Sequence, residues 1–256
     1  MLRKITILGT GTIIPAPGRN CSGYLLYTDE GLILLDCGPG TLIQLTGLGV
    51  DFAEIKYFFL THFHLDHVSD LFAVILSRWL RGAPENDTIF LNGPKGLNEM
   101  VKNAKKYFFS DEKWMDLEKI IIREIAEDSF QLGNLSISTL YTRHTKNSIC
   151  YRIDDEAGKS FFYSGDTGYN ENIVNLGSGA DIAVLECSHS DSYPDREGHM
   201  SFSDIIKYAG KVKTGKLLLS HFYPDFFTDS NIEIIENELN TFITKDLDTF
   251  SFNDFS

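Results

Sequence analysis

The sequence predicts an α/β fold in which two β-sheets are covered by helices, and three observations support this prediction. Short β-rich apolar runs alternate with helical stretches along the 256 residues. No linker or low-complexity segment separates them, so we expect a single domain over residues 1–256. Several apolar runs end on a titratable residue, as strands do when they present polar side chains at one edge of a sheet. These residues are Asp36, His62, Asp166, Glu186 and His221.

The expected elements follow in chain order. We predict strands at 4–8, 23–28, 32–36, 57–62, 88–92, 119–124, 135–142, 148–153, 160–166, 182–187, 216–221 and 249–252. Helices are expected just after Pro39 and at 67–81, 95–109, 201–211 and 230–240. The segment DDEAGK predicts a turn between two of the strands. Similar strand endings in the two halves of the chain suggest an internal duplication around a central cleft.

The charge of the chain indicates which partners it can bind, and its cysteine pattern indicates the redox environment in which it works. The formal net charge of −13 is spread along the sequence with no basic block, which disfavours a long polyanionic partner. The four cysteines lie far apart with no C-x-x-C pair, so we expect free thiols in a reducing cytoplasm. The N-terminal run turns into Gly and Pro signals, which predicts a first strand and not a signal peptide. No apolar run is long enough to span a bilayer, so no membrane contact is expected.

Residues 60–71, LTHFHLDHVSDL, concentrate three of the seven histidines directly after an apolar run. Imidazole and carboxylate are ligands for Zn²⁺ and, less selectively, for Mn²⁺ or Fe²⁺. His62 and His64 are two apart on an extended stretch, so their rings face the same side. Asp66 and His67 then begin a helix and can face the same pocket from another direction. A solvated surface cluster of histidines is the alternative, but the residue types and the preceding strand favour a metal site.

The stretch THFHLDH resembles the signature of the metallo-β-lactamase fold superfamily. The segments ILGTGTIIPAPGRNCSGYLL and LILLDCGPGTLIQL are similar to the opening of ribonuclease Z and its smaller relatives, and EGHMS resembles the Gly-His-Ser/Thr motif of that family. The similarity runs from about Ile7 to Tyr223. It implies a four-layer αββα sandwich of two mixed β-sheets flanked by helices, the metallo-β-lactamase fold, with a dinuclear metal site in the cleft between the sheets.

The resemblance also implies which residues hold two divalent metal ions, expected to be Zn²⁺ with Mn²⁺ or Fe²⁺ as alternatives. Three imidazoles would hold the first ion, two imidazoles and a carboxylate would hold the second, and a further carboxylate would bridge them. In that order the residues are His62, His64 and His144; Asp66, His67 and His221; and Asp166.

Three further residues have predicted roles of different kinds. Asp36 is either a carboxylate that orients a ligating imidazole or a helix N-cap or turn former, with equal weight. His189 has no secure counterpart in the family and is expected to be an exposed loop residue, with a place in the pocket as the alternative. Ribonuclease Z-like phosphodiesterases use the histidine that matches His199 as proton donor to the leaving group, so His199 is expected to be catalytic, together with Asp66.

Two neighbouring cations allow a bridging water to ionise near neutral pH, and with His199 this predicts phosphodiester hydrolysis. Ribonuclease Z carries a long tRNA-gripping arm between the positions of His144 and Asp166, whereas only 21 residues separate these two here. We therefore expect an armless relative, a phosphodiesterase that acts on a small or flexible diester. Cyclic nucleotides, short nucleotide esters and phospholipid-derived diesters fit this description, and folded tRNA is disfavoured.

Other functions remain open at this point. Fold and metals alone do not select the electrophile, so an arylsulfatase or lactonase of the same fold is the first alternative. A tRNA 3′-processing endonuclease and a non-hydrolytic metal-binding protein are two more. A homodimer is suggested by the resemblance, with no interface indicated by the sequence.

Overall fold

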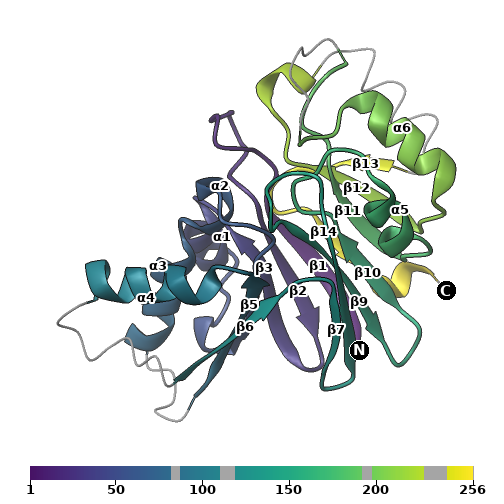
Figure 1. Cartoon of the computed structure of the whole chain (residues 1–256). Helices are drawn as coiled ribbons and strands as arrows, with labels where there is room; N and C mark the ends of the chain where they lie inside the picture. The colour runs from purple at the N-terminus through teal and green to yellow at the C-terminus, as the bar shows by residue number, and fades with distance from the viewer. Residues whose placement is uncertain (82–86, 110–118, 192–197, 228–240, 256) are drawn as a thin grey trace.

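The computed structural model describes residues 1–81, 87–109, 119–191, 198–227 and 241–255. Within them, two seven-stranded sheets face each other and helices cover the outer face of each sheet (Figure 1). This arrangement confirms the predicted αββα sandwich of two mixed sheets. The helix expected at 230–240 lies outside the described residues.

The first sheet has the strand order β14-β1-β2-β3-β4-β5-β6. Strands β14, β1, β2 and β3 pair antiparallel, whereas β3, β4, β5 and β6 pair parallel. The parallel half therefore brings the carboxyl ends of β3 and β4 to the same edge. The bounds are β1 Leu2–Gly9, β2 Gly23–Thr28, β3 Gly31–Cys37, β4 Ile55–Phe59, β5 Ile89–Pro94, β6 Ile120–Ile125 and β14 Thr249–Ser251.

The second sheet has the order β13-β12-β11-β10-β9-β8-β7. Its first strands in the chain, β7 to β10, pair antiparallel, and β10 to β13 pair parallel. Both sheets thus pass from an antiparallel to a parallel half, which agrees with the suggested duplication. The bounds are β7 Asp128–Leu132, β8 Leu135–Tyr141, β9 Ile149–Asp155, β10 Ser160–Tyr163, β11 Ile182–Glu186, β12 Lys216–Ser220 and β13 Thr241–Ile243.

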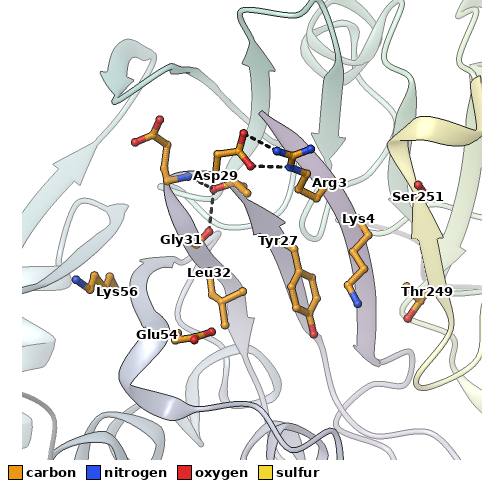
Figure 2. Close-up of a pocket in the computed structure, with 12 residues that line it drawn as sticks. Arg3, Lys4, Tyr27, Asp29, Gly31, Leu32, Glu54, Lys56, Thr249 and Ser251 are labelled. Carbon is orange, nitrogen blue, oxygen red and sulfur yellow. Dashed lines mark hydrogen bonds and ion pairs between the residues drawn. The ribbon is translucent and has the colours of Figure 1, made fainter. Parts of the chain in front are cut away.

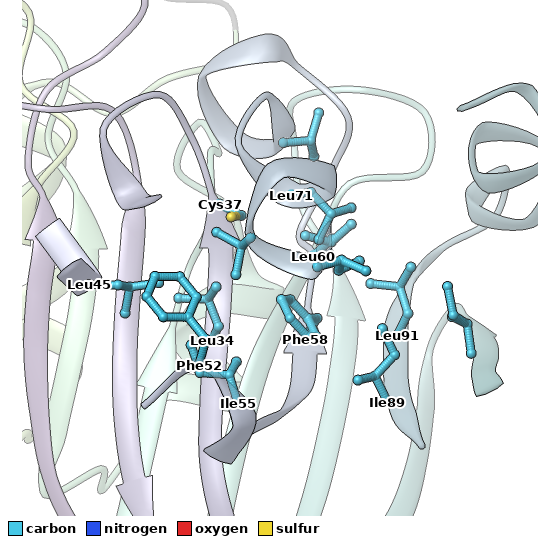
Figure 3. Packing of buried hydrophobic residues seen from close by; sticks show 14 of the residues in the cluster. Leu34, Cys37, Leu45, Phe52, Ile55, Phe58, Leu60, Leu71, Ile89 and Leu91 are labelled. Atoms are coloured by element: carbon cyan, nitrogen blue, oxygen red, sulfur yellow. The ribbon is translucent and has the colours of Figure 1, made fainter. Parts of the chain in front are cut away.

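Three hydrophobic clusters hold the four layers together. One lies between the first sheet and its helices, where Leu45 lies beside Phe52, and Leu71 lies above Phe58 (Figure 3). Burying each side chain of this kind contributes about 2 kcal/mol. A second cluster fills the space between the two sheets, and a third lies under α5 and α6. The helices are α1 Thr41–Gly47, α2 Leu65–Val68, α3 Leu71–Leu80, α4 Leu97–Phe108, α5 Glu171–Gly177 and α6 Phe202–Lys211, with 3-10 turns η1 Phe52–Glu54, η3 Pro224–Phe226 and η4 Phe252–Phe255.

The described helices include none with the length and apolar character that a membrane crossing requires.

The structure differs from the predicted elements in a few places. The single helix expected at 67–81 is two helices, because Asp70 interrupts it: its N–H donates to the Cys37 carbonyl and its carboxylate accepts from Gly40 and Leu42 at the start of α1. Helix α5 and the strands β7 and β13 were not expected. Strands β7 and β13 are edge strands that are only partly buried, so their apolar pattern is weak.

Candidate metal centre

The carboxyl ends of parallel strands from both sheets converge at one edge of the sandwich. Asp36 lies in β3 and His62 follows β4. In the second sheet Asp166 follows β10, Glu186 ends β11 and His221 directly follows β12. All five side chains are buried. The strand ends singled out in the sequence therefore meet in the folded chain.

A first cluster of potential ligands contains the H-x-H pair. The rings of His62 and His64 have centroids 4.6 Å apart, as expected for residues two apart on an extended chain. His144, from the segment after β8, places Nε2 3.0 Å from Nδ1 of His64. With Asp166, these three histidines place four ligand atoms within 4.8 Å of one another.

A second cluster combines helix α2 with the end of β12. Asp66 and His67 lie in α2, and His64 is its N-cap residue. Nε2 of His221 is 3.4 Å from Asp66 Oδ2 and also 3.4 Å from Nε2 of His67. The ligand atoms of Asp66, His67 and His221 lie within 4.8 Å of one another.

Asp166 joins the two clusters, because each of its oxygens faces a different one. Oδ2 lies 3.6 Å from Nε2 of His62 and 3.7 Å from Nε2 of His144. Oδ1 lies 3.2 Å from Nε2 of His67 and 3.3 Å from Nε2 of His221. This is the geometry that a carboxylate shared by two cations requires.

Four of the imidazoles are held so that Nε2 turns toward Asp166, because protein atoms engage Nδ1 of each. Fixing one ring nitrogen in this way sets the orientation of a ligating histidine. The Nδ1 partners are Thr61 Oγ1 for His62 at 3.0 Å, Asp36 Oδ2 for His67 at 2.8 Å, the Gly198 carbonyl for His144 at 2.9 Å, and Ser188 Oγ for His221 at 2.9 Å.

These residues fit a pair of divalent cations. Within the described residues, buried Nε2 of His62 and Oδ1 of Asp166 have no hydrogen-bond partner. A buried polar atom without a partner costs about 1–3 kcal/mol, and a cation at each cluster removes that cost. The donor set of imidazole nitrogens and carboxylate oxygens suits Zn²⁺ and also Mn²⁺ or Fe²⁺.

Asp36 bonds His67, as the first of its two predicted roles requires. Its carboxylate accepts hydrogen bonds from the backbone N–H and the hydroxyl of Thr61 at 2.8 Å each, from His67 at 2.8 Å and from the Tyr163 hydroxyl at 2.7 Å. Both Asp36 and His221 have a positive φ, at 52° and 61°. Non-glycine residues adopt this region rarely, and they do so mainly where surrounding contacts fix the backbone at a functional site.

Glu186 anchors His199 beside the two clusters. Its carboxylate accepts from Nδ1 of His199 at 3.1 Å, from the Ser188 hydroxyl and from the Met200 N–H. The ring of His199 lies against His144 and His221, with centroid distances of 4.7 and 5.5 Å.

The pKa values of these groups are shifted by burial and by neighbouring charged side chains. Burial lowers the pKa of His199, but the charge and hydrogen bond of Glu186 outweigh this and raise it to about 9. Burial raises the pKa of Asp166, yet the attraction of His221 and His67 holds it well below its ordinary value. Burial, together with His67, lowers the pKa of His62 well below its ordinary value.

Sequence reasoning missed three supporting residues. Glu186 was noted only as the end of an apolar run and Gly198 only as part of the EGHMS motif, and nothing pointed to Ser188. Gly198 has φ 89°, and a Cβ there would lie 2.9 Å from Nδ1 of His144, so glycine allows the close approach that orients this histidine. The expectation that His189 is exposed was wrong: its side chain is buried, with the ring centroid 4.4 Å from that of Tyr223 and 5.9 Å from that of His199.

Two depressions differ in their relation to the clusters. The larger, of about 740 Å³, lies where Gly31 begins β3, at the opposite end of the strands from Asp36 (Figure 2). There Arg3 and Asp29 pair with each other, and no histidine contributes to the lining. A smaller one, of about 300 Å³, is lined in part by His62 and His64 and is therefore continuous with the first cluster.

Comparison with known proteins agrees with this geometry. The profile of the beta-lactamase superfamily domain matches residues 32–222. Ribonuclease Z of Mycolicibacterium gilvum is 30% identical over 242 residues, which is 86% of this chain and 84% of that enzyme. Mitochondrial ribonuclease Z 2 of Schizosaccharomyces pombe is 30% identical over 229 residues, or 85% of this chain, and this chain spans about a third of that enzyme (34%). The metallo-beta-lactamase fold protein YhfI of Bacillus subtilis has a similar structure, with a TM-score of 0.81, 23% identity and coverage of 98% of this chain and 100% of YhfI.

Proposed function

The chain belongs to the beta-lactamase superfamily, a superfamily of metal-dependent hydrolases, and we propose that it is a phosphodiesterase of the ribonuclease Z type that acts on a small or flexible diester. The observation that carries the proposal is Asp166, whose two oxygens face two separate histidine clusters with His199 alongside. This arrangement supports a cofactor of two divalent ions, with Zn²⁺ as the proposed metal.

In this proposal His62, His64 and His144 hold one ion, Asp66, His67 and His221 hold the other, and Asp166 bridges them. When bound, the two ions would supply a hydroxide at neutral pH and polarise the phosphoryl oxygen.

The remaining chemistry belongs to side chains of the chain itself. His199, held through Nδ1 by Glu186, donates a proton from Nε2 to the departing oxygen. Asp66 accepts the backbone N–H of Ile13 at 3.2 Å through Oδ2, and this bond fixes the carboxylate where it orients the attacking water.

The segment between His144 and Asp166 supports the proposal of a small substrate. It contains the antiparallel pair β9 and β10 joined by a short turn, and no arm. A folded tRNA would therefore lack the support that the arm gives it in ribonuclease Z, and the net charge of −13 further opposes tRNA binding.

We also propose that the chain forms a single domain and that it is cytoplasmic, because all four cysteines are free thiols. A homodimer is the assembly to test.

A substrate panel tests the proposed function. The purified chain with Zn²⁺ or Mn²⁺ is assayed on bis(p-nitrophenyl) phosphate, the monoester p-nitrophenyl phosphate, p-nitrophenyl sulfate, a lactone, a cyclic nucleotide and a precursor tRNA. We expect diester kcat/KM to exceed the monoester and sulfate values about a hundredfold, because the site matches the transition state of one ester class. Absence of diester turnover with every metal rejects the proposal, and faster cleavage of the tRNA selects the endonuclease alternative.

Replacing His199 by alanine separates a proton donor from a structural residue. We expect His199→Ala to lower kcat about 10²- to 10³-fold on a diester with an alkyl leaving group, because an alkoxide leaves only when protonated. The loss on a p-nitrophenyl diester should be much smaller, since p-nitrophenolate leaves unprotonated. Metal content is measured alongside. Equal losses on both substrates would contradict proton donation.

A further inference from the structure

The smaller depression opens directly beside the first histidine cluster. A substrate whose diester lies at His62 and His64 can therefore reach it. Its lining residues are His62, Phe63, His64, Pro94, Lys95, Thr145, Lys146 and Asn147.

The depression is cationic although the chain is acidic. Two lysines, Lys95 and Lys146, contribute to its lining, and no carboxylate does, whereas the whole chain carries 36 acidic and 23 basic residues. Among the described residues, neither ammonium group takes part in an ion pair. Glu124 acts electrostatically with Lys95, but its Oε1 accepts the N–H groups of Gly96 and Asn98. Both lysines are thus available to an anion.

The two loops that carry the lysines are fixed relative to each other. The Asn147 amide donates to the Lys95 carbonyl at 3.2 Å and so connects the loop after β5 to the loop after β8. Ser148 bonds the Thr145 backbone N–H at 3.0 Å, which closes the turn containing Lys146. A site whose backbone is held in this way loses less entropy when a ligand binds.

One wall of the depression is apolar. Buried Pro94 and the ring of Phe63 line it, and the ring lies so close to Gly96 that a Cβ added to this glycine would be 3.3 Å from Cε2 of Phe63. An apolar wall of this kind suits the flat face of a nucleobase.

Two other depressions differ from this one in the charge of their lining residues and in their distance from the histidine clusters. One of about 310 Å³ contains Arg143 but also the carboxylate of Glu171 and no residue of either cluster. The large depression of about 740 Å³ mixes three cations with three carboxylates, among them Asp29, Glu30 and Glu54. Of the three, the one with Lys95 and Lys146 is the one that adjoins the metal centre.

We propose that this depression is a subsite for a second anionic group, so that the preferred substrates are phosphodiesters that carry an additional phosphate, as a phosphorylated nucleotide diester does. This inference rests on the proposed phosphodiesterase function. Lys95 and Lys146 bind the additional phosphate while the histidine clusters engage the diester.

Two matched substrates test the subsite. Thymidine 5′-(p-nitrophenyl phosphate) and its 3′-phosphorylated form share the scissile bond and the leaving group and differ by one phosphate. We expect the wild type to prefer the 3′-phosphorylated form about tenfold in kcat/KM, an advantage that falls with added salt. The double variant Lys95→Gln/Lys146→Gln should reduce this ratio to about one. Lys102→Gln, on the exposed side of α4, is the matched control and should keep the wild-type ratio.

A binding measurement separates failure of the subsite from failure of the function. Calorimetry compares thymidine 3′,5′-bisphosphate with thymidine 5′-monophosphate on the wild type and the double variant. If the bisphosphate binds more tightly than the monophosphate, and if this difference depends on the two lysines, the subsite is supported even when neither ester is cleaved. The absence of cleavage would then reject only the proposed phosphodiesterase function. Turnover of both esters at equal kcat/KM, with equal binding of the two nucleotides, overturns the subsite and leaves the proposed function standing.

Discussion

The Asp166→Asn variant is expected to lose most of its bound metal and about 10³-fold in diester hydrolysis, which corresponds to about 4 kcal/mol of transition-state stabilisation. The carboxylate places one oxygen toward each cluster, at 3.2 to 3.7 Å from four Nε2 atoms. An amide keeps the shape but carries no charge and offers one oxygen in place of two. One cation would therefore lose its oxygen ligand, and the other would keep only a neutral oxygen, in a single substitution.

Elemental analysis and kcat measured on the same preparation check this result. Asp155→Asn is the matched control, because Asp155 is a buried carboxylate at the far end of β9 that binds the N–H groups of Leu2, Ala157 and Lys159. It should lower stability but leave metal content unchanged. An Asp166→Asn protein that still holds two ions per chain would contradict the bridging role.

Local patterns predicted the residues of the two clusters well. The H-x-H-x-D-H spacing places four side chains within six consecutive residues, and apolar strands that end on Asp166 and His221 indicate where others come from. Parallel pairing of β3 with β4, of β10 with β11 and of β11 with β12 then brings these ends together.

Contacts between segments distant in sequence could not be predicted in the same way. Glu186 meets His199, and Ser188 meets His221, only because β11, β12 and the start of α6 pack side by side. His189 lies in a polar stretch that reads as an exposed loop, yet its backbone pairs with Met200 and Phe202 and its side chain becomes buried.

The second large effect is expected at Asp36, where asparagine should lower the free energy of unfolding by about 3 kcal/mol. Oδ2 accepts from the Thr61 hydroxyl, from His67 and from Tyr163, and Oδ1 accepts the Thr61 N–H. An amide that keeps its oxygen toward the backbone N–H turns its NH₂ group toward the other three donors. Hydrogen bonds to a buried charge contribute about 1.5–3 kcal/mol each, and some of this loss is recovered as hydroxyls rotate. Asparagine tolerates a positive φ, so backbone strain adds little.

Metal affinity distinguishes the two roles that the sequence left open for Asp36. A turn former would lower stability alone, whereas a carboxylate that orients His67 should also lower the affinity of the second cluster about 10- to 100-fold. Urea unfolding of the metal-free protein measures the first effect, and competition with a chromogenic chelator measures the second. Tyr163→Phe is the control: it removes one hydrogen bond to the buried charge of Asp36, about 1.5–3 kcal/mol, and leaves the bond to His67 intact. If Asp36→Asn binds the second ion as tightly as the wild type, the orienting role is wrong and the carboxylate stabilises only the turn at the end of β3.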